Sequence, residues 1–252
     1  GNQLLQDGKK NVAIVYVDNS YGNGLKKVTA GIVTKGGAKV KTYAFAENET
    51  NFASIVDKVV ATKPDAVAII SYDEAKKAIP AFKAKKFNGS NFYLVDGNLA
   101  DYSKTSFASY LKGSKGTLPG KATAASFKNK LAAAYKAVEN KDLTEFSYGA
   151  ETYDAVILVA LAAQAAGKAS GEAIKSELTN VSLAGKGKST VTSFAAGLAA
   201  IKAGKKVNYD GFSGPVEFDS NGDPTGAFIG IYKYDAAGKY NLVRTVAGNS
   251  TK

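Results

Sequence analysis

Apolar residues in the first hundred positions follow two alternating spacings. The run Val12–Val17 is continuously apolar, which is typical of a strand buried on both faces. Leu25, Val28 and Ile32 then recur every three or four residues, which predicts an amphipathic helix that ends at Gly36-Gly37. The same alternation continues through predicted strands at 40–45, 66–70 and 92–95 and predicted helices at 52–60 and 75–82.

This order of elements favours one fold class. Strands that alternate with helices pair in parallel through right-handed crossovers, so the helices cover both faces of the sheet. The sequence therefore predicts an α/β fold with a doubly wound, Rossmann-like parallel sheet.

The second half of the chain has a different pattern. Ala-rich segments at 121–138, 148–166, 170–179 and 190–203 predict four helices. A β region follows, with a strand at 215–218, a tight turn at 219–224, a strand at 227–234 and a hairpin that continues to Val246. Because no apolar strand separates the helices, we expect them to lack a central sheet of their own.

The composition excludes several kinds of chemistry. The 252 residues contain no Cys, His, Met or Trp. This absence removes thiol nucleophiles, His bases and Cys/His metal sites. Gly22-Asn23-Gly24 begins like a dinucleotide fingerprint, but Lys27 occupies the third glycine position. We therefore expect no catalytic residues, no metal and no cofactor, and an enzyme would need carboxylate, Tyr or Lys chemistry.

The net charge of +11 comes almost entirely from Lys, and Arg244 is the single arginine. Proteins that read nucleic acid usually cluster basic residues and use Arg for contacts to bases. Here the lysines are dispersed in pairs such as Lys26-Lys27 and Lys76-Lys77. Solvated helix faces explain this pattern, with attraction to an acidic wall or membrane surface as the alternative. No nucleic-acid partner is expected.

Candidate binding residues follow the predicted strands. Ligands of open parallel sheets bind at the carboxyl ends of the strands. At those ends Asp96 is suited to hold an ammonium group, and Tyr21 and Tyr72 are suited to wall an apolar side chain. Asn19 and Ser71 complete the predicted ligand-binding set. The alternatives are an Asx-turn or helix cap for Asp96 and ordinary packing at the loop edge for the two tyrosines.

Four segments, in order, carry a resemblance to a known family. They are Asn11–Leu25, Gly116–Gly120, Tyr153–Ala155 and Gly204–Asp219. Together they resemble the periplasmic-binding-protein type 1 family, in particular its leucine/isoleucine/valine-binding branch. The last segment is the most specific of the four.

The resemblance implies an architecture. Members of the family close two α/β lobes on a small solute and deliver it to the membrane permease of an ABC transporter. Residues 9–120 with 226–248 would form the ligand-binding lobe, and 121–225 the helical part of the other lobe. The family's N-terminal segment of about 120 residues, which carries the sheet of that other lobe, does not occur in this sequence.

The resemblance also implies a function and roles for individual residues. Tyr21 and Tyr72 match aromatic positions that contact the ligand, and Asp96 matches the acidic position that contacts the α-ammonium group. Groups that hold the α-carboxylate would come from the absent segment. We therefore expect an extracytoplasmic protein that binds a branched-chain or small neutral amino acid and is not an enzyme. A ligand-sensing ectodomain or regulator on the same fold is the alternative.

Overall fold

The structure is a computed structural model, and it describes residues 1–219 and 221–249. The chain divides into two compact units. One contains residues 1–118 and 231–244, and the other contains 119–230 and 245–252. Among the described residues, no helix combines the length and the apolar character needed to cross a membrane.

A seven-stranded sheet forms the centre of the first unit, with the strand order β10-β9-β5-β4-β3-β1-β2. Its strands are β1 (Asn11–Val17), β2 (Lys39–Phe45), β3 (Ala66–Ile70), β4 (Phe92–Leu94), β5 (Lys115–Pro119), β9 (Gly226–Tyr234) and β10 (Tyr240–Asn249). Strand β1 pairs in parallel with β2 and β3, and the parallel pairing continues from β3 to β4 and from β4 to β5. The predicted parallel sheet is confirmed.

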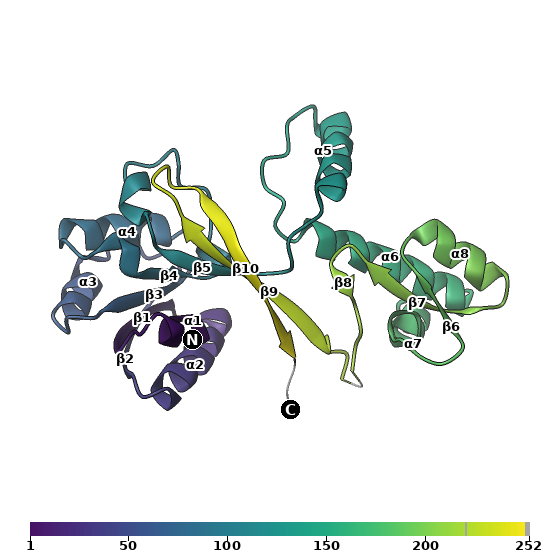
Figure 1. Ribbon diagram of the computed structural model, residues 1–252, viewed down its shortest axis with the longest axis horizontal. Helices are drawn as coiled ribbons and strands as arrows, with labels where there is room; N and C mark the ends of the chain where they lie inside the picture. Colours follow the sequence, from purple (N-terminus) through teal and green to yellow (C-terminus); the bar gives the residue numbers. More distant parts are fainter. Residues whose placement is uncertain (220, 250–252) are drawn as a thin grey trace. The chain divides into compact units, whose positions relative to one another are not determined.

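Helices cover both faces of this sheet (Figure 1). Short α1 (Asn2–Gln6) and long α2 (Ser20–Lys35) lie on one face, and α3 (Ala53–Val60) and α4 (Ala75–Ala84) lie on the other. Alternate residues of β1 point to opposite layers: Ile14 packs in the cluster that contains Val33 of α2, and Val15 packs in the cluster that contains Val56 of α3. Each such buried aliphatic side chain contributes about 1.5–3 kcal/mol. The doubly wound arrangement is thereby confirmed.

Strand β5 was not predicted as a strand, because its sequence Lys-Gly-Thr-Leu-Pro has one large aliphatic residue. The structure explains why β5 has a glycine at position 116. A Cβ atom at Gly116 would lie 2.4 Å from Cδ1 of Leu99, so close packing excludes a side chain there. Three short 3-10 helices lie between α4 and β5: η1 (Gly89–Asn91) precedes β4, and η2 (Asp96–Asn98) and η3 (Ala108–Leu111) follow it.

The second unit corrects the prediction that its helices lack a sheet. Its helices are α5 (Ala125–Glu139), α6 (Gly149–Ala166), α7 (Gly171–Ser182) and α8 (Phe194–Lys202), and its strands are β6 (Lys188–Val191), β7 (Lys206–Gly211) and β8 (Gly214–Pro215). Strand β6 pairs in parallel with β7, which pairs antiparallel with β8.

The region 190–203, predicted as one helix, contains the end of β6 and the whole of α8. The sequence signal for β6 is weak because its four residues include one buried apolar side chain, Val191. That side chain packs in a core with Leu161 of α6 and with Val207 and Tyr209 of β7. Tertiary packing therefore decides the conformation of this segment.

The predicted tight turn after β8 is supported by the hydrogen bonds of Asp219. Its carboxylate accepts the backbone N–H groups of Asn221 and Asp223. Ser220, which falls within the predicted turn, lies outside the described residues.

Candidate functional site

Three of the predicted site residues meet beyond the carboxyl ends of β1, β3 and β4. The hydroxyl of Tyr21, in the first turn of α2, donates a 2.7 Å hydrogen bond to Oδ1 of Asp96 in η2. The ring of Tyr21 stacks on the ring of Tyr72, which follows β3, with the ring centroids 5.0 Å apart and the planes inclined by 22°. A carboxylate and two phenol rings therefore form one cluster at the end of the sheet where parallel folds bind ligands.

A backbone group completes the environment of the Tyr21 hydroxyl. The N–H of Gly97 donates to this oxygen at 3.2 Å while the hydroxyl donates to Asp96. Burial, followed by the hydrogen bond to Asp96 and the charge of Asp96, raises the pKa of Tyr21 well above its usual value. The phenol therefore stays protonated at neutral pH and remains a donor to the carboxylate.

Gly97 is required by this geometry. A Cβ atom at Gly97 would lie 2.6 Å from the carbonyl oxygen of Ser71, 2.9 Å from the hydroxyl of Tyr21 and 3.1 Å from Cδ1 of Tyr72. A side chain at Gly97 would thus push apart the groups that form the cluster.

The exposure of the three side chains differs in a way that suits binding. Tyr72 is 41% exposed, although it is a large aromatic residue stacked on another ring. Tyr21 and Asp96 are half-buried. An accessible aromatic face beside a partly desolvated carboxylate can contact an apolar group and a cation together.

Asn19, the fourth predicted residue, has a structural position. Its side-chain oxygen accepts the N–H of Gly22 and caps the N-terminus of α2. Its Nδ2 donates at 2.5 Å to Oε1 of Glu47, which follows β2. The cap fixes the first turn of α2, which carries Tyr21. A direct contact between Asn19 and a ligand stays a prediction.

Ser71, the fifth predicted residue, is fully buried. Its hydroxyl donates to the backbone oxygen of Tyr72 and accepts a 2.9 Å hydrogen bond from Nδ2 of Asn98. These bonds join Ser71 to the backbone of Tyr72 and to the side chain of Asn98. A ligand-binding role for Ser71 also stays a prediction.

Two buried residues that were not chosen from the sequence support the cluster. Glu74 accepts the backbone N–H of Tyr72 at 2.9 Å and that of Asn48 at 3.3 Å, which joins the loops that follow β2 and β3. Asn98 joins the ends of β3 and β4. Both follow strand ends in the sequence, but nothing in the sequence distinguishes them from the other polar loop residues there.

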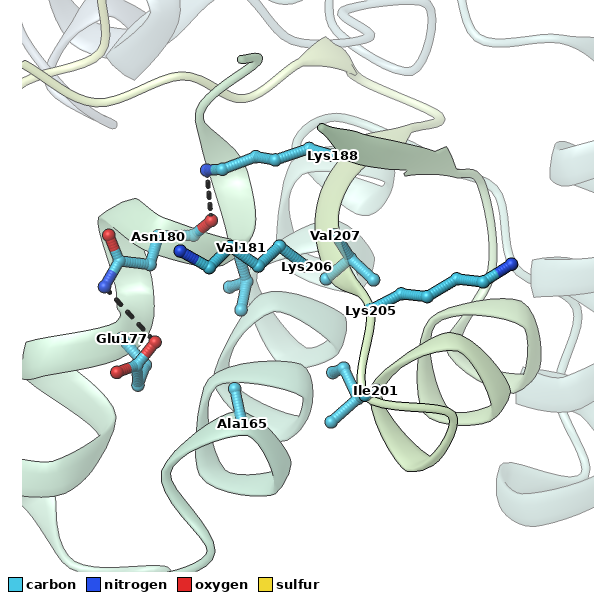
Figure 2. A pocket seen from close by; sticks show the side chains of 10 residues that line it. Ala165, Glu177, Asn180, Val181, Lys188, Ile201, Lys205, Lys206 and Val207 are labelled. Atoms are coloured by element: carbon cyan, nitrogen blue, oxygen red, sulfur yellow. Dashed lines mark hydrogen bonds between the residues drawn. The ribbon is translucent and has the colours of Figure 1, made fainter. Parts of the chain in front are cut away.

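A pocket of about 400 Å³ in the second unit is a further candidate (Figure 2). Its lining combines apolar side chains, among them Val181, Ile201 and Val207, with polar ones from Glu177, Asn180, Lys188, Lys205 and Lys206. However, Nζ of Lys188 donates to the carbonyl oxygens of Asn180 and Leu183 at 2.6 and 2.7 Å. Those carbonyls end α7, where cations neutralise the negative end of the helix dipole. We therefore interpret Lys188 as a cap of α7.

The described part of the chain contains no group of three or more carboxylates that could hold a metal ion.

Comparison with known families decides the relationship of the chain to other proteins. A family model described as the receptor family ligand binding region matches residues 8–235. The chain belongs to this family. No curated protein matches the chain.

Solved structures similar to this member of the receptor ligand-binding family include three solute-binding proteins. The leucine-binding protein LivK from Thermotoga maritima is 19% identical, with a TM-score of 0.72, and the match covers 96% of this chain and 62% of that one. LivJ from Streptococcus pneumoniae, solved with isoleucine, is 18% identical, with a TM-score of 0.66 and coverages of 98% and 63%. A fatty acid ABC transporter substrate-binding protein from Thermomonospora curvata is 17% identical, with a TM-score of 0.66 and coverages of 99% and 61%.

These similarities establish the periplasmic-binding-protein type 1 fold, as the resemblance implied. The chain spans less than two thirds of the length of these three structures. Their ligands are an amino acid in two cases and a fatty acid in the third, so the fold alone does not define the ligand.

Proposed function

We propose that this protein is an extracytoplasmic solute-binding protein of an ABC transporter, and that its ligand is a branched-chain or small neutral amino acid. The observation that carries the proposal is the cluster of Tyr21, Tyr72 and Asp96. The carboxylate of Asp96 receives the ligand's ammonium group, and the exposed ring of Tyr72 contacts the apolar side chain. The names of the leucine- and isoleucine-binding neighbours support this choice of ligand.

The carboxylate favours an amino acid over a fatty acid, although a fatty-acid-binding neighbour has a similar fold. A fatty acid carries a carboxylate at its polar end, and a second carboxylate at Asp96 would repel it. At about 4 Å, two like charges near a protein surface repel by about 4 kcal/mol. An ammonium group at the same position is attracted by a comparable amount, which is the basis of the assignment.

The lobes and partners follow from the same proposal. Residues 9–120 with 226–248 act as the lobe that holds the ammonium group and side chain, and 121–225 belong to the other lobe. The loaded protein delivers its ligand to a membrane permease, without catalysis.

A ligand-sensing ectodomain is the second candidate, because the matching family is described as a receptor ligand-binding region. A search for ligand-dependent association with either a permease or a signalling partner separates these two candidates.

Calorimetry with three matched probes tests the binding proposal. Leucine carries both charged groups, 3-methylbutylamine lacks the carboxylate, and 4-methylpentanoate lacks the ammonium group. We expect heat of binding from leucine and from 3-methylbutylamine, and none from 4-methylpentanoate. Binding of 4-methylpentanoate in preference to the amine would contradict the proposal.

A further inference from the structure

The loop that carries Asp96 and the strand end that carries Tyr72 are joined by one buried amide. Asn98 is 3% exposed and lies at the end of η2, two residues after Asp96. Its Oδ1 accepts the backbone N–H of Val95 at 2.9 Å, which closes the short helical turn around Asp96. Within η2 the side chain of Asn98 thus fixes the backbone that presents the carboxylate.

The other end of the amide crosses to the neighbouring strand. Nδ2 of Asn98 donates to the carbonyl oxygen of Ile69 in β3 at 2.8 Å and to Oγ of Ser71 at 2.9 Å. Ser71 in turn donates to the backbone oxygen of Tyr72. One amide therefore uses its acceptor toward the loop of Asp96 and both of its donor hydrogens toward the strand of Tyr72.

We propose that Asn98 is a positioning residue for the ligand site, which sets the carboxylate of Asp96 against the stacked rings of Tyr21 and Tyr72. The inference rests on the proposed function for its effect on binding, but its structural claim concerns the ligand-free protein. Val95 lies directly before Asp96 in the chain, and Ser71 lies directly before Tyr72. A shift at either end of the amide therefore moves one side of the cluster relative to the other.

Packing in the cluster explains why a small shift matters. Gly97 lies so close to Tyr21, Tyr72 and the carbonyl of Ser71 that even a Cβ atom does not fit. The hydrogen bond between Tyr21 and Asp96, at 2.7 Å, depends on the same spacing. Buried groups with fully used hydrogen bonds hold such geometry more rigidly than apolar packing alone.

The test compares Asn98→Ala with Ser114→Ala. Ser114 is also fully buried in the first unit, and its hydroxyl donates to the carbonyl of Leu111 at 2.6 Å, so this control also loses a buried side-chain hydrogen bond. The first readout is the carboxyl ¹³C signal of Asp96 in the ligand-free protein, assigned by its loss in Asp96→Asn. We expect Asn98→Ala to move this signal in the direction in which Tyr21→Phe moves it, and Ser114→Ala to leave it in place.

The second readout is the affinity for 3-methylbutylamine, which we expect to fall about tenfold in Asn98→Ala and to stay unchanged in Ser114→Ala. Ser71→Ala breaks one of the three hydrogen bonds of the Asn98 side chain. Should Asn98→Ala not fold, this variant decides the question, and we expect it to displace the Asp96 signal by a smaller amount. If the Asp96 signal does not move in a folded Asn98→Ala variant, the positioning role is wrong, whatever the affinity for 3-methylbutylamine. If the signal moves but the unsubstituted protein binds neither leucine nor 3-methylbutylamine, the positioning role is supported and the proposed function is wrong.

Discussion

The hydroxyl of Tyr21 and the carboxylate of Asp96 are 2.7 Å apart, although 75 residues separate them in the chain. Tyr21 lies in the first turn of α2, which follows β1, and Asp96 lies in η2, which follows β4. A parallel sheet brings the ends of these strands to the same edge, so the fold itself creates the pair. Loss of this hydrogen bond is therefore expected to affect binding more than folding.

Tyr21→Phe removes the hydroxyl and keeps the ring that stacks on Tyr72. The carboxylate of Asp96 then loses a hydrogen bond that orients it, and we expect about a fivefold to tenfold loss of leucine affinity by calorimetry, which corresponds to about 1 kcal/mol. Tyr110→Phe is the matched control. Its hydroxyl donates to the carbonyl of Phe87, and burial raises the pKa of Tyr110 to about 12. Equal losses in both variants would argue against a specific role for Tyr21.

Gly97→Ala places a methyl group against Tyr21, Tyr72 and the carbonyl of Ser71. We expect weaker amine binding and a loss of about 1–3 kcal/mol in the free energy of unfolding. Gly24→Ala, in the second turn of α2, is the contrasting variant, since a Cβ atom there meets nothing within 4 Å. It should stabilise the protein by about 0.5–1 kcal/mol. Urea denaturation of both variants measures the difference, and a tolerated methyl at Gly97 would show that the cluster is loosely packed.

Asp7 links the amino-terminal helix α1 to the sheet. It accepts from Lys115 at 2.5 and 2.6 Å and from the hydroxyl of Tyr93 at 2.5 Å. Burial opposes ionisation of Asp7, but the hydrogen bonds from Lys115 and Tyr93 and the charge of Lys115 outweigh it and lower its pKa below the ordinary value of 3.8. Ionised Asp7 therefore stabilises the folded state above about pH 4, and this stabilisation is lost as the pH falls through the lowered pKa.

Asp7→Asn should therefore cost about 1–3 kcal/mol at pH 7 and less at pH 3. Asp57→Asn is its control, because the ion pair of Asp57 with Lys85 is largely exposed and contributes about 0–1 kcal/mol. Denaturation curves of the unsubstituted protein, Asp7→Asn and Asp57→Asn at pH 7 and pH 3 provide the comparison. A cost for Asp7→Asn that grows on acidification would have the wrong sign for this account.

Asp154 of α6 is a buried acceptor that ties the segment 209–213 to this helix. It is 1% exposed, and its carboxylate accepts from the hydroxyl of Tyr209, the backbone N–H of Phe212 and both the N–H and the hydroxyl of Ser213. Asp154→Ala leaves these buried donors without an acceptor, so we expect a loss of about 3 kcal/mol or more in the free energy of unfolding.

The matched control for that variant is Asp142→Ala, whose carboxylate forms an exposed ion pair with Lys136. We expect a change within about 0.5 kcal/mol there. Thermal or urea unfolding followed by circular dichroism checks both, and similar values for the two variants would contradict the structural role of Asp154.

The first unit could be predicted well because two of its central strands, β1 and β3, contain continuous apolar runs. Val12–Val17 and Ala66–Ile70 are both buried, and the helices between the strands have a clear apolar face. The strands β5 and β6 escaped prediction because their conformation depends on neighbours: Gly116 packs against Leu99, and Val191 joins a core formed by residues far away in the sequence.

The candidate site was predictable to the level of strand ends. The rule that ligands bind at the carboxyl edge selects Tyr21, Tyr72 and Asp96 together, but it also selects Asn19 and Ser71, which the structure uses as a helix cap and a buried support. Sequence spacing does not distinguish a side chain that faces the edge from one that faces the interior. That distinction requires the hydrogen bonds themselves.

Asp96→Asn, measured by calorimetry with leucine, tests the central claim most directly. This substitution removes the negative charge of Asp96 and keeps the shape of its side chain. The control is Asp73→Asn, which removes a negative charge at the same edge of the sheet from a side chain that is 88% exposed. We predict that leucine affinity falls about 10- to 100-fold in Asp96→Asn, as expected for loss of a charge-assisted hydrogen bond, and changes little in Asp73→Asn. Unchanged affinity in Asp96→Asn, or an equal loss in both variants, would contradict the assignment of the ammonium group to Asp96.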